Sequence, residues 1–498
     1  MPSMSTSNIA SSSQRSESPV SEHRESPRGS SLSRTTPSDF DILCDNVKPT
    51  ARVLPGHSRR HSLVTPELVV RKERRERSKP YSRPSPRKLF TICGQQFRPT
   101  VVFDTFWKFA AERHNIYNKR RAGEPAPWTE DHILKKHKFC NTYRVLDKVC
   151  QYLIKEVIEK GSQDPTEVVF RIVLFNTFTR ISTWELLTSE LGPLTWATYD
   201  REKYGAVLTR HRKRSGTKGG KRGDINPVYT GSFQKPHPAF GYDETHMNHL
   251  CLLEIMMEND LPSKLLGTPY LADIYEYLIS FPSMGPFSTY QLMLNLSYSD
   301  VLNFHPNDFV VPGLGASSGL CKMFGKSRLA IAKRTVPDIE IEIIRWMTET
   351  QDEHFKRLGL TFTGLGPKNL PMDLSDVEHT ICEVDKYARE AHPSISGGKR
   401  INLGPTFTPS SGTFPKAIFP KAWSHPARKV SRLRPDRKLV IEKRYVVSHI
   451  GKHREGENGM EYYVFWEGYA ASEATWEPEL ALTADAPLAV EQYLATLT

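Results

Sequence analysis

The 498-residue chain contains no apolar run that approaches the roughly 20 residues of a membrane-spanning helix. Its N-terminus, MPSMSTSNIASSSQ, lacks the apolar stretch of a signal peptide. The seven cysteines are spread along the chain without a CxxC pair, and the 17 histidines include no HExxH motif. These absences argue against a membrane or secreted protein, a disulfide framework and a metal site, and they favour a reducing compartment.

The net charge of +12 is concentrated in a few segments. Residues 1–90 contain 17 Lys and Arg against nine Asp and Glu, and residues 391–444 contain 12 against two. Residues 445–498 are acidic, with nine acids against two basic residues. The region between is close to neutral, although the stretch 210–222, which is expected to be a loop, contains seven positive charges. Basic segments of this kind attract nucleic acid through salt-sensitive contacts, so DNA is the expected partner.

Composition divides the chain into four parts. Residues 1–88 are rich in Ser, Pro and Arg and have few aromatic residues, so they cannot bury enough apolar surface to offset chain entropy. Residues 89–390 hold most of the apolar side chains and predict a mainly helical domain. Residues 391–439 are basic and contain many Pro and Gly residues, which indicates a linker. We therefore expect a disordered tail, a helical domain, a linker and a C-terminal module at 440–498.

The C-terminal module has the pattern of three strands followed by a helix. Segments 444–450, 461–467 and 474–477 are rich in β-branched and aromatic residues and are separated by turn-like residues. Residues 485–497 have apolar side chains at helical spacing. This order predicts a small α+β fold, with a three-stranded antiparallel sheet and a C-terminal helix.

The segments YVVSHI, EYYVFWEGY, ATWEPE and VEQYLA resemble a chromodomain over the whole length of this module. The resemblance implies a nuclear, chromatin-associated protein that binds a methylated lysine of a histone tail and meets other chromatin proteins. Recognition would use an aromatic cage, in which each cation–π contact contributes about 0.5–2 kcal/mol. Carried over by position, the cage residues are Tyr445, Trp466 and Tyr469, with Glu473 as the nearby acid.

A second function stays open for the chromodomain. Lys443 and Arg444 stand where the resemblance implies acids, and a positive charge beside a cation site is repulsive. Ala481 stands where many members have an Asn that holds the peptide backbone. The alternative is a chromodomain that contacts protein or nucleic acid without reading methyl-lysine. Trp476 matches the structural tryptophan of the family and is expected to pack.

Helical spacing of apolar residues recurs through the middle region. The expected helices cover residues 100–114, 132–161, 167–187, 270–279, 339–356 and 373–391. The segment 132–161 predicts one long helix or two consecutive helices that end at Gly161. Thr129 is the expected N-cap before it.

Polar groups in these helices suggest contacts with nucleic acid. Asn141 and Arg144 are three apart, so on a helix they share a face and could contact a base edge or a phosphate. The alternative is a surface network of Arg144 with Asp147. A Pro-Gly-x-Gly turn with Gly313 and Gly315 could let backbone N–H groups approach a phosphate, as in a helix-hairpin-helix element. The alternative is an ordinary turn between helices.

An acid and a lysine are paired further along the chain. Glu383 and Lys386 are three apart on a predicted helix and could perform acid–base chemistry if buried. The alternative is an exposed ion pair, which contributes little to stability. The spacing alone favours the ion pair.

Several blocks in order resemble the α-glutamyl/putrescinyl thymine pyrophosphorylase family, also described as the 5-hydroxymethyl-deoxyuridine DNA kinase helical domain. The blocks are FWKFAAERHNIYNKRRAG, PWTEDHILKKHKFCNTYRVLDKV, GPFSTYQLMLNLSYS, VPGLGASSGLCKMFG and DVEHTICEVDKYAR. The resemblance spans roughly residues 89–390 and implies a mainly α, DNA-glycosylase-like fold. It also implies action on a hydroxymethylated thymine base of DNA, splayed from the duplex. It does not name a cofactor.

The resemblance carries over a set of site residues. The catalytic candidates are Asn141, Arg144, Asp147, Glu383 and Lys386, and the DNA- or phosphate-binding candidates are Trp128, Gly313 and Gly315, to which the basic stretch adds Arg210, Arg212, Lys213 and Arg214. One position departs from the family, because Asn295 stands where an acid is expected. The helical domain is therefore either a base-modifying transferase or kinase-associated enzyme, or an inactive DNA-binding platform.

Overall fold

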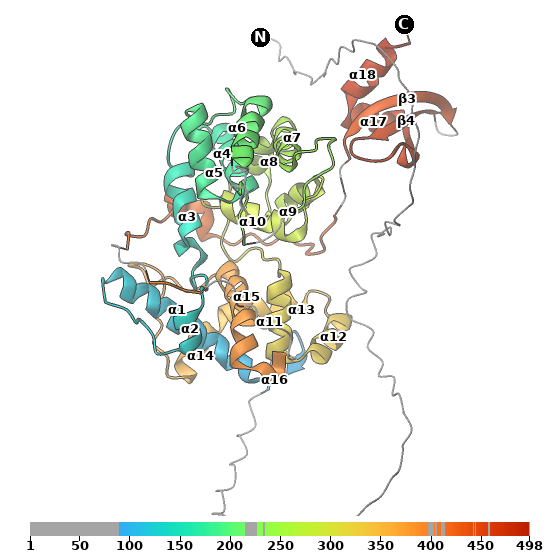
Figure 1. Ribbon diagram of the computed structural model, residues 1–498. Coiled ribbons are helices and arrows are strands. Elements are labelled where there is room, and N and C mark those ends of the chain that lie inside the picture. Colours follow the sequence, from blue (N-terminus) through green and yellow to red (C-terminus); the bar gives the residue numbers. More distant parts are fainter. Residues whose placement is uncertain are drawn as a thin grey trace, which may run out of the picture. The chain divides into compact units, whose positions relative to one another are not determined.

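Figure 1 shows the computed structural model of the chain. The described residues are 89–214, 227–232, 235–396, 403, 406–409, 414–441, 443, 445–456 and 459–497. The expected disordered tail at 1–88 and residues 215–222 of the basic stretch lie outside them. Within the described ranges, no helix is long and apolar enough to cross a membrane.

The helical domain begins with a hairpin and a long helix. Strand β1 (Phe90–Ile92) pairs antiparallel with β2 (Gln95–Phe97), and α1 (Val101–Arg121) follows. Helix α1 begins where the Thr100 hydroxyl accepts a hydrogen bond from the backbone N–H of Val102. The helix extends past the predicted end at residue 114. The hairpin was not predicted, because three-residue strands are too short to show a period of two.

A non-helical stretch at 137–143 divides the segment 132–161, so the prediction of one long helix or two directly consecutive helices was wrong. It forms α2 (His132–Lys136), the 3₁₀ turn η2 (Arg144–Leu146), α3 (Lys148–Tyr152) and the π-helical turn η3 (Leu153–Ile158). Residues 137–143 contain no helix, because side chains in this stretch bond to backbone groups that a helix would use.

The N-cap of α2 also differs from the prediction. The Asp131 carboxylate accepts hydrogen bonds from the N–H groups of Ile133 and Leu134, which makes Asp131 the cap. Thr129 instead accepts a hydrogen bond from the N–H of Asp131.

One group of helices, labelled from α4 to α10 in Figure 1, packs around α4. The group contains α4 (Pro165–Phe178), α5 (Ile181–Leu191), α6 (Arg201–Arg214), α7 (Thr245–Glu258), α8 (Leu261–Gly267), α9 (Leu271–Ser280) and α10 (Pro286–Leu296). The expected helix at 167–187 is two helices, because Thr179 ends α4 in a left-handed conformation with φ of 46°.

A second group packs around α15 (Leu374–Ala391). It contains α1, the β1–β2 hairpin, α11 (Leu314–Phe324), α12 (Lys326–Thr335), α13 (Ile339–Glu349), α14 (Gln351–Arg357) and the short α16 (Pro393–Ser396). Asp373 and Asp376 form a capping box that starts α15. Val377, Ile381 and Val384 are fully buried on one face, as the helical spacing of this segment predicts.

Helices α11 and α15 approach each other through glycines. A Cβ atom added at Gly315 would lie 2.3 Å from the Sγ of Cys382, and one added at Gly319 would lie 2.8 Å from the backbone oxygen of Ile381. Both distances are too short for real contacts, so the spacing of the two helices requires glycine at both positions. The small residues after the Pro-Gly-x-Gly turn therefore serve helix packing.

The second half of the predicted linker lies against the helical domain. The Gln151 amide exchanges hydrogen bonds with the backbone of Ile418, at 2.9 Å and 2.8 Å. Arg434 forms ion pairs with Asp273 and Glu276 of α9. The aromatic residues between its prolines supply the buried area, since Phe414, Phe419 and Trp423 pack on the core. The segment includes the 3₁₀ turns η4 (Lys421–Ser424) and η5 (Pro426–Lys429).

The C-terminal module has the predicted fold. Strands β3 (Val447–Gly456), β4 (Gly459–Trp466) and β5 (Thr475–Pro478) form an antiparallel sheet in that order. The 3₁₀ turn η6 (Ala471–Glu473) precedes β5, and α17 (Glu479–Asp485) and α18 (Pro487–Ala495) follow it. The core consists of Ile450, Tyr462, Val464, Leu482, Val490 and Tyr493. Strand β3 continues through the stretch that was expected to be a turn.

The glycine contact between α11 and α15 yields a stability prediction. We expect Gly319→Ala to lower the free energy of unfolding by about 1–3 kcal/mol, because the new methyl group meets a backbone carbonyl that cannot move aside. Gly267→Ala, in α8, is the matched control, because a Cβ atom there has no neighbour within 4 Å. Urea unfolding of the full chain measures both. Equal stability of the two variants would show that the helix spacing adapts.

Candidate functional site

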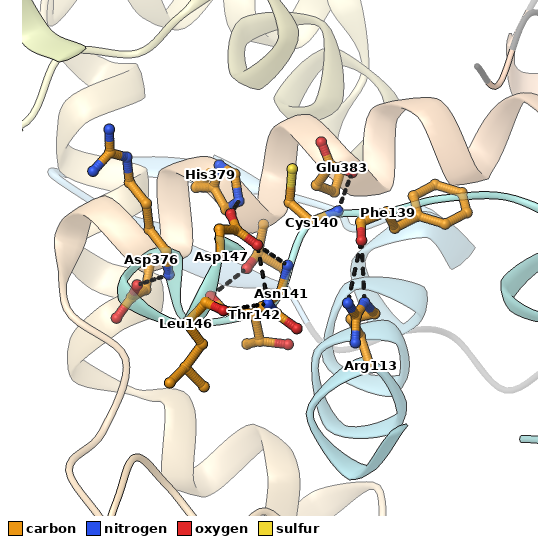
Figure 2. A network of polar contacts seen from close by, with 12 residues as sticks. Arg113, Phe139, Cys140, Asn141, Thr142, Leu146, Asp147, Asp376, His379 and Glu383 are labelled. Carbon is orange, nitrogen blue, oxygen red and sulfur yellow. Dashed lines mark hydrogen bonds and ion pairs between the residues drawn. The ribbon is translucent and has the colours of Figure 1, made fainter. Parts of the chain in front are cut away.

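The irregular segment 137–147 lies along α15 and is fixed to it by three hydrogen bonds. Side chains one helical turn apart on α15 bond to every second residue of the segment. The three bonds join Cys140 N to Glu383 Oε2 (3.0 Å), Thr380 Oγ1 to Thr142 O (3.3 Å) and Arg144 N to Asp376 Oδ1 (2.9 Å). Figure 2 shows the first and last of these. The two predicted clusters, which are far apart in sequence, therefore meet at one place.

Asn141 and Asp147 close the segment on itself. One carboxylate oxygen of Asp147 accepts hydrogen bonds from the backbone N–H of Asn141 at 2.8 Å and from its side-chain amide at 3.0 Å (Figure 2). The same amide donates to the backbone oxygen of Leu146. Asn141 and Arg144 therefore do not share a helix face, and the amide of Asn141 is occupied within the loop.

Arg144 leaves this cluster and reaches α10. Its guanidinium is buried and donates to the hydroxyl of Tyr298 at 2.9 Å, to Gln291 Oε1 at 2.9 Å and to Asn295 Oδ1 at 3.0 Å. Buried charged donors need such acceptors, because an unpaired charge in the interior is costly. Arg144 thus connects the segment on α15 with the other group of helices.

Asn295, the residue that departs from the family pattern, lies in this network. Its oxygen accepts from Arg144 and its amide nitrogen donates to Asn176 Oδ1 of α4 at 2.9 Å. An aspartate here would face the guanidinium directly and would form an ion pair with it. In this chain the contact is instead a charge-assisted hydrogen bond from the guanidinium to a neutral amide oxygen.

Glu383 is buried and bonded on both oxygens. Besides the backbone N–H of Cys140, it contacts the Lys386 ammonium at 2.5 Å. Burial would raise the pKa of Glu383, but the Lys386 ammonium, the neighbouring His379 and these hydrogen bonds hold it below its usual value. Glu383 is therefore a carboxylate at neutral pH. The pair is half-buried, unlike the exposed pair that spacing alone favoured.

Asp147, His379 and Cys140 form a tight cluster beside Glu383 (Figure 2). Burial raises the pKa of Asp147, although nearby His379 and the hydrogen bond from Asn141 partly oppose this effect. Burial lowers the pKa of His379, so its ring is neutral near pH 7. Sequence reasoning missed both His379 and Cys140. The signal for His379 was its position one turn before Glu383 in the same motif.

In the chromodomain, three aromatic side chains converge. The ring of Tyr445 lies 5.7 Å from that of Trp466 and 5.6 Å from that of Tyr469, measured between centroids. Tyr445 and Tyr469 are 52% and 51% exposed, so their faces are open to a ligand. The indole N–H of Trp466 donates to Thr475 Oγ1 at 2.9 Å, which fixes the ring. Glu473 accepts the backbone N–H of Ala470 in the adjoining turn.

Comparison with known families decides the assignment of the helical region. The model of the 5-hmdU DNA kinase helical domain matches residues 100–397, which is more than half of the chain. The chain belongs to this family. The model of the Chromo (chromatin organisation modifier) domain matches residues 445–495. No curated protein and no solved structure matches the chain. Both resemblances found in the sequence are confirmed.

Within the 5-hmdU DNA kinase helical domain, the predicted phosphate contacts at Gly313 and Gly315 have other partners. The backbone N–H of Gly313, at the N-terminus of α11, donates to Glu378 Oε1 at 2.9 Å. Burial raises the pKa of Glu378 to about 7. Gly315 packs on Cys382. The start of α11 is thus covered by a carboxyl group of α15, which accounts for the glycine turn without a phosphate.

Trp128 also packs within the domain. Its indole N–H donates to the backbone oxygen of Glu124 at 2.7 Å, and the guanidinium of Arg120 lies 5.0 Å from its ring centroid. The same guanidinium lies over the ring of Phe414, from the packed part of the predicted linker. Arg120 therefore joins Trp128 to that segment, and one face of the indole is occupied.

The basic residues at 210–214 form the last turns of α6, so this part of the predicted loop is helical. Arg210 pairs with Glu190 at 2.6 Å, and Arg212 pairs with Glu244 at 2.5 Å. Their charges are balanced by these acids, so the structure does not single them out as phosphate contacts. The side chains of Lys213 and Arg214 lie outside the described residues.

The Arg144 network makes a prediction for Asn295. We expect Asn295→Asp to keep the unfolding free energy within about 1 kcal/mol of the wild type at pH 7, because its carboxylate pairs with Arg144 and the Asn176 amide can rotate to donate. Asn295→Leu, of similar size, should cost about 2–3 kcal/mol because Arg144 loses an acceptor.

The unfolding free energies of the two variants should also depend differently on pH. Pairing with Arg144 depresses the pKa of the new carboxyl group below its unfolded value, so its contribution is present above about pH 4 and is lost as the pH falls. Unfolding by urea at pH 7 and below pH 4 measures this difference. A similar cost for Asp and Leu at pH 7 would exclude the role given to the Arg144 network.

Proposed function

We propose that the chain is a nuclear, chromatin-associated protein that binds DNA through its 5-hmdU DNA kinase helical domain and a methylated lysine of a histone tail through its chromodomain. The observation that carries the proposal is the cluster of Tyr445, Trp466 and Tyr469. A methylated ammonium group is large and weakly hydrated, and it gains most from several aromatic faces at once.

The chemistry of the cage supports a cationic ligand. The Glu473 carboxylate accepts the backbone N–H of Ala470, the residue after Tyr469, which supports an acid close to the cage. A negative charge at this range favours a cation between the rings. Of the two basic residues before the cage, Arg444 lies outside the described residues. The other, Lys443, donates its ammonium protons to the backbone oxygens of Ile279 at 2.6 Å and Met284 at 2.8 Å.

The sheet of the chromodomain has a second, different surface. Trp476, which was expected to pack, lies outside the core and packs on Tyr463 on the outer face of the sheet, at 5.0 Å between ring centroids. The guanidinium of Arg454 lies 4.1 Å from the Trp476 centroid, and Lys452 lies over both rings. Paired cations and aromatic rings are typical of nucleic-acid contacts. This face supports the alternative in which the module contacts nucleic acid.

For the helical domain, an alternative is an inactive DNA-binding platform. Arg144, Asn141 and Glu383 all make hydrogen bonds that hold the fold, and Asn295 replaces an acid of the family pattern. These observations favour the platform. The cluster of Asp147 with His379 supports retained chemistry.

The cage assignment predicts the effect of one substitution. We expect Trp466→Ala to weaken binding of a trimethyl-lysine histone peptide at least tenfold, because the ligand loses one aromatic face. Phe465→Ala is the matched control, because Phe465 precedes Trp466 on β4 but stacks on His449, at 4.4 Å between centroids. Fluorescence anisotropy with labelled peptides from several histone sites measures both variants. Equal binding by Trp466→Ala and the wild type would refute the cage.

The helical domain is tested with matched duplexes that contain thymine or 5-hydroxymethyluracil. Basic segments of the full chain bind both duplexes alike, so a difference in affinity reports recognition of the base. We expect about tenfold tighter binding to the modified duplex, a typical value for one recognised base pair. Equal affinities across a salt series would refute base recognition.

Mass spectrometry of nucleosides after incubation, with and without nucleoside triphosphate, separates the enzyme from the platform. On the platform alternative, the wild type forms no new nucleoside. A product formed by the wild type would establish an enzyme. A product formed only by Asn295→Asp would assign the loss of activity to that residue.

A further inference from the structure

Cys140, Asp147 and His379 bring three different ligand types to one point. The thiol sulfur, a carboxylate oxygen and a ring nitrogen all lie within 4.8 Å of one another. They come from the two ends of the irregular segment and from α15, and Figure 2 shows them on neighbouring sides of a small space. Nitrogen, sulfur and oxygen ligands together are typical of zinc sites.

The contact between Asp147 and His379 fits two ligands of one ion. The atoms Oδ2 and Nε2 are 3.6 Å apart, which is too long for a hydrogen bond. The nitrogen is buried and has no hydrogen-bond partner among the described residues. Two ligand atoms at about 2.0–2.1 Å from a tetrahedral zinc ion lie about 3.3 Å apart, so a small adjustment would place both on the ion.

The surrounding residues orient the three ligands. Asn141 occupies the other oxygen of Asp147 with two hydrogen bonds, which leaves Oδ2 directed at His379. Glu383 accepts the backbone N–H of Cys140 and so fixes the residue that carries the thiol. Hydrogen bonds of this kind hold ligands in place around metal ions and increase the affinity.

The charges around the cluster favour a divalent cation. The Glu383 carboxylate lies beside Cys140, whose backbone N–H it accepts at 3.0 Å, and its own charge is paired with Lys386. A thiolate and a carboxylate with a neutral imidazole carry two negative charges, which a divalent cation balances. The thiolate disfavours Mg²⁺ and Ca²⁺, which prefer oxygen ligands.

We propose that Cys140, Asp147 and His379 bind one Zn²⁺ ion. Three protein ligands leave the fourth tetrahedral position for water or for an oxygen of a ligand, as in zinc sites that take part in chemistry. The site lies in the cluster that contains the predicted residues Asp147 and Glu383. The proposal does not depend on DNA or histone binding.

The experiment measures zinc bound to the full chain after chelation and dialysis against a defined Zn²⁺ concentration. We expect one zinc per chain by elemental mass spectrometry, and substitution with Co²⁺ should give a cobalt–thiolate charge-transfer band. Cys140→Ser and His379→Gln, which change the residue volume little, should each weaken zinc binding at least tenfold. Cys140→Ser should also remove the charge-transfer band.

Two controls distinguish this site from adventitious binding. Cys93→Ser changes an exposed cysteine and His132→Gln an exposed histidine, and both variants should keep the bound zinc. Circular dichroism of the metal-free proteins checks that each variant folds. If a variant fails to fold, the wild type is alkylated instead, and peptide mapping identifies the modified cysteine. Loss of the cobalt–thiolate band on alkylation of Cys140 would then support the proposal, and a band that persists would contradict it. A wild type that binds less than one zinc ion per chain would overturn the proposal. Zinc affinity that is unchanged in both Cys140→Ser and His379→Gln would overturn it as well.

Discussion

The buried guanidinium of Arg144 is the contact on which the arrangement of the helical domain depends. Its backbone is fixed to α15 through Asp376, and its side chain ends on three acceptors contributed by or next to α10. A buried arginine is tolerated only when its donors are satisfied, so the two groups of helices must meet at a set distance and angle. The position of the irregular segment follows from this requirement, and so does the position of the cluster around Asp147.

Helix α15 has an apolar face that packs in the core and a polar face that bonds to the irregular segment. One face holds fully buried aliphatic side chains and receives the glycines of α11 at close range. The other bears polar groups at turn spacing that bond to the backbone of the segment 140–144. Most residues that looked catalytic in the sequence therefore have a defined structural task. The side-chain atoms of Asp147, His379 and Cys140 face one another and form the proposed zinc site.

The sequence predicted the fold class, the chromodomain and the long helices α1, α4 and α15, because those depend on periodic apolar residues over many positions. It named no helix in the stretches that form α6 to α8 and α10 to α12. The prediction failed where side chains compete with the backbone for hydrogen bonds, as at Asn141. It also failed where packing between segments distant in sequence determines the local structure. The glycines at 313–315 have the local pattern of a phosphate site, but their partners on α15 lie more than 60 residues away. The Cys140–His379 proximity has no local pattern at all. In the chromodomain the resemblance separated Trp466 from Trp476, but the cluster of Trp476 with Tyr463, Arg454 and Lys452 was not predicted.

The packed end of the predicted linker changes the mechanics of the two-domain chain. Val440 donates its backbone N–H to Glu276 of α9, and the first cage residue, Tyr445, follows only five positions later. A fully extended chain of five residues spans at most about 18 Å. A short tether of this kind gives each domain a high effective concentration near the ligand of the other. On the proposed function, this tether would favour a DNA site and a histone tail that lie close together over pairs that are far apart.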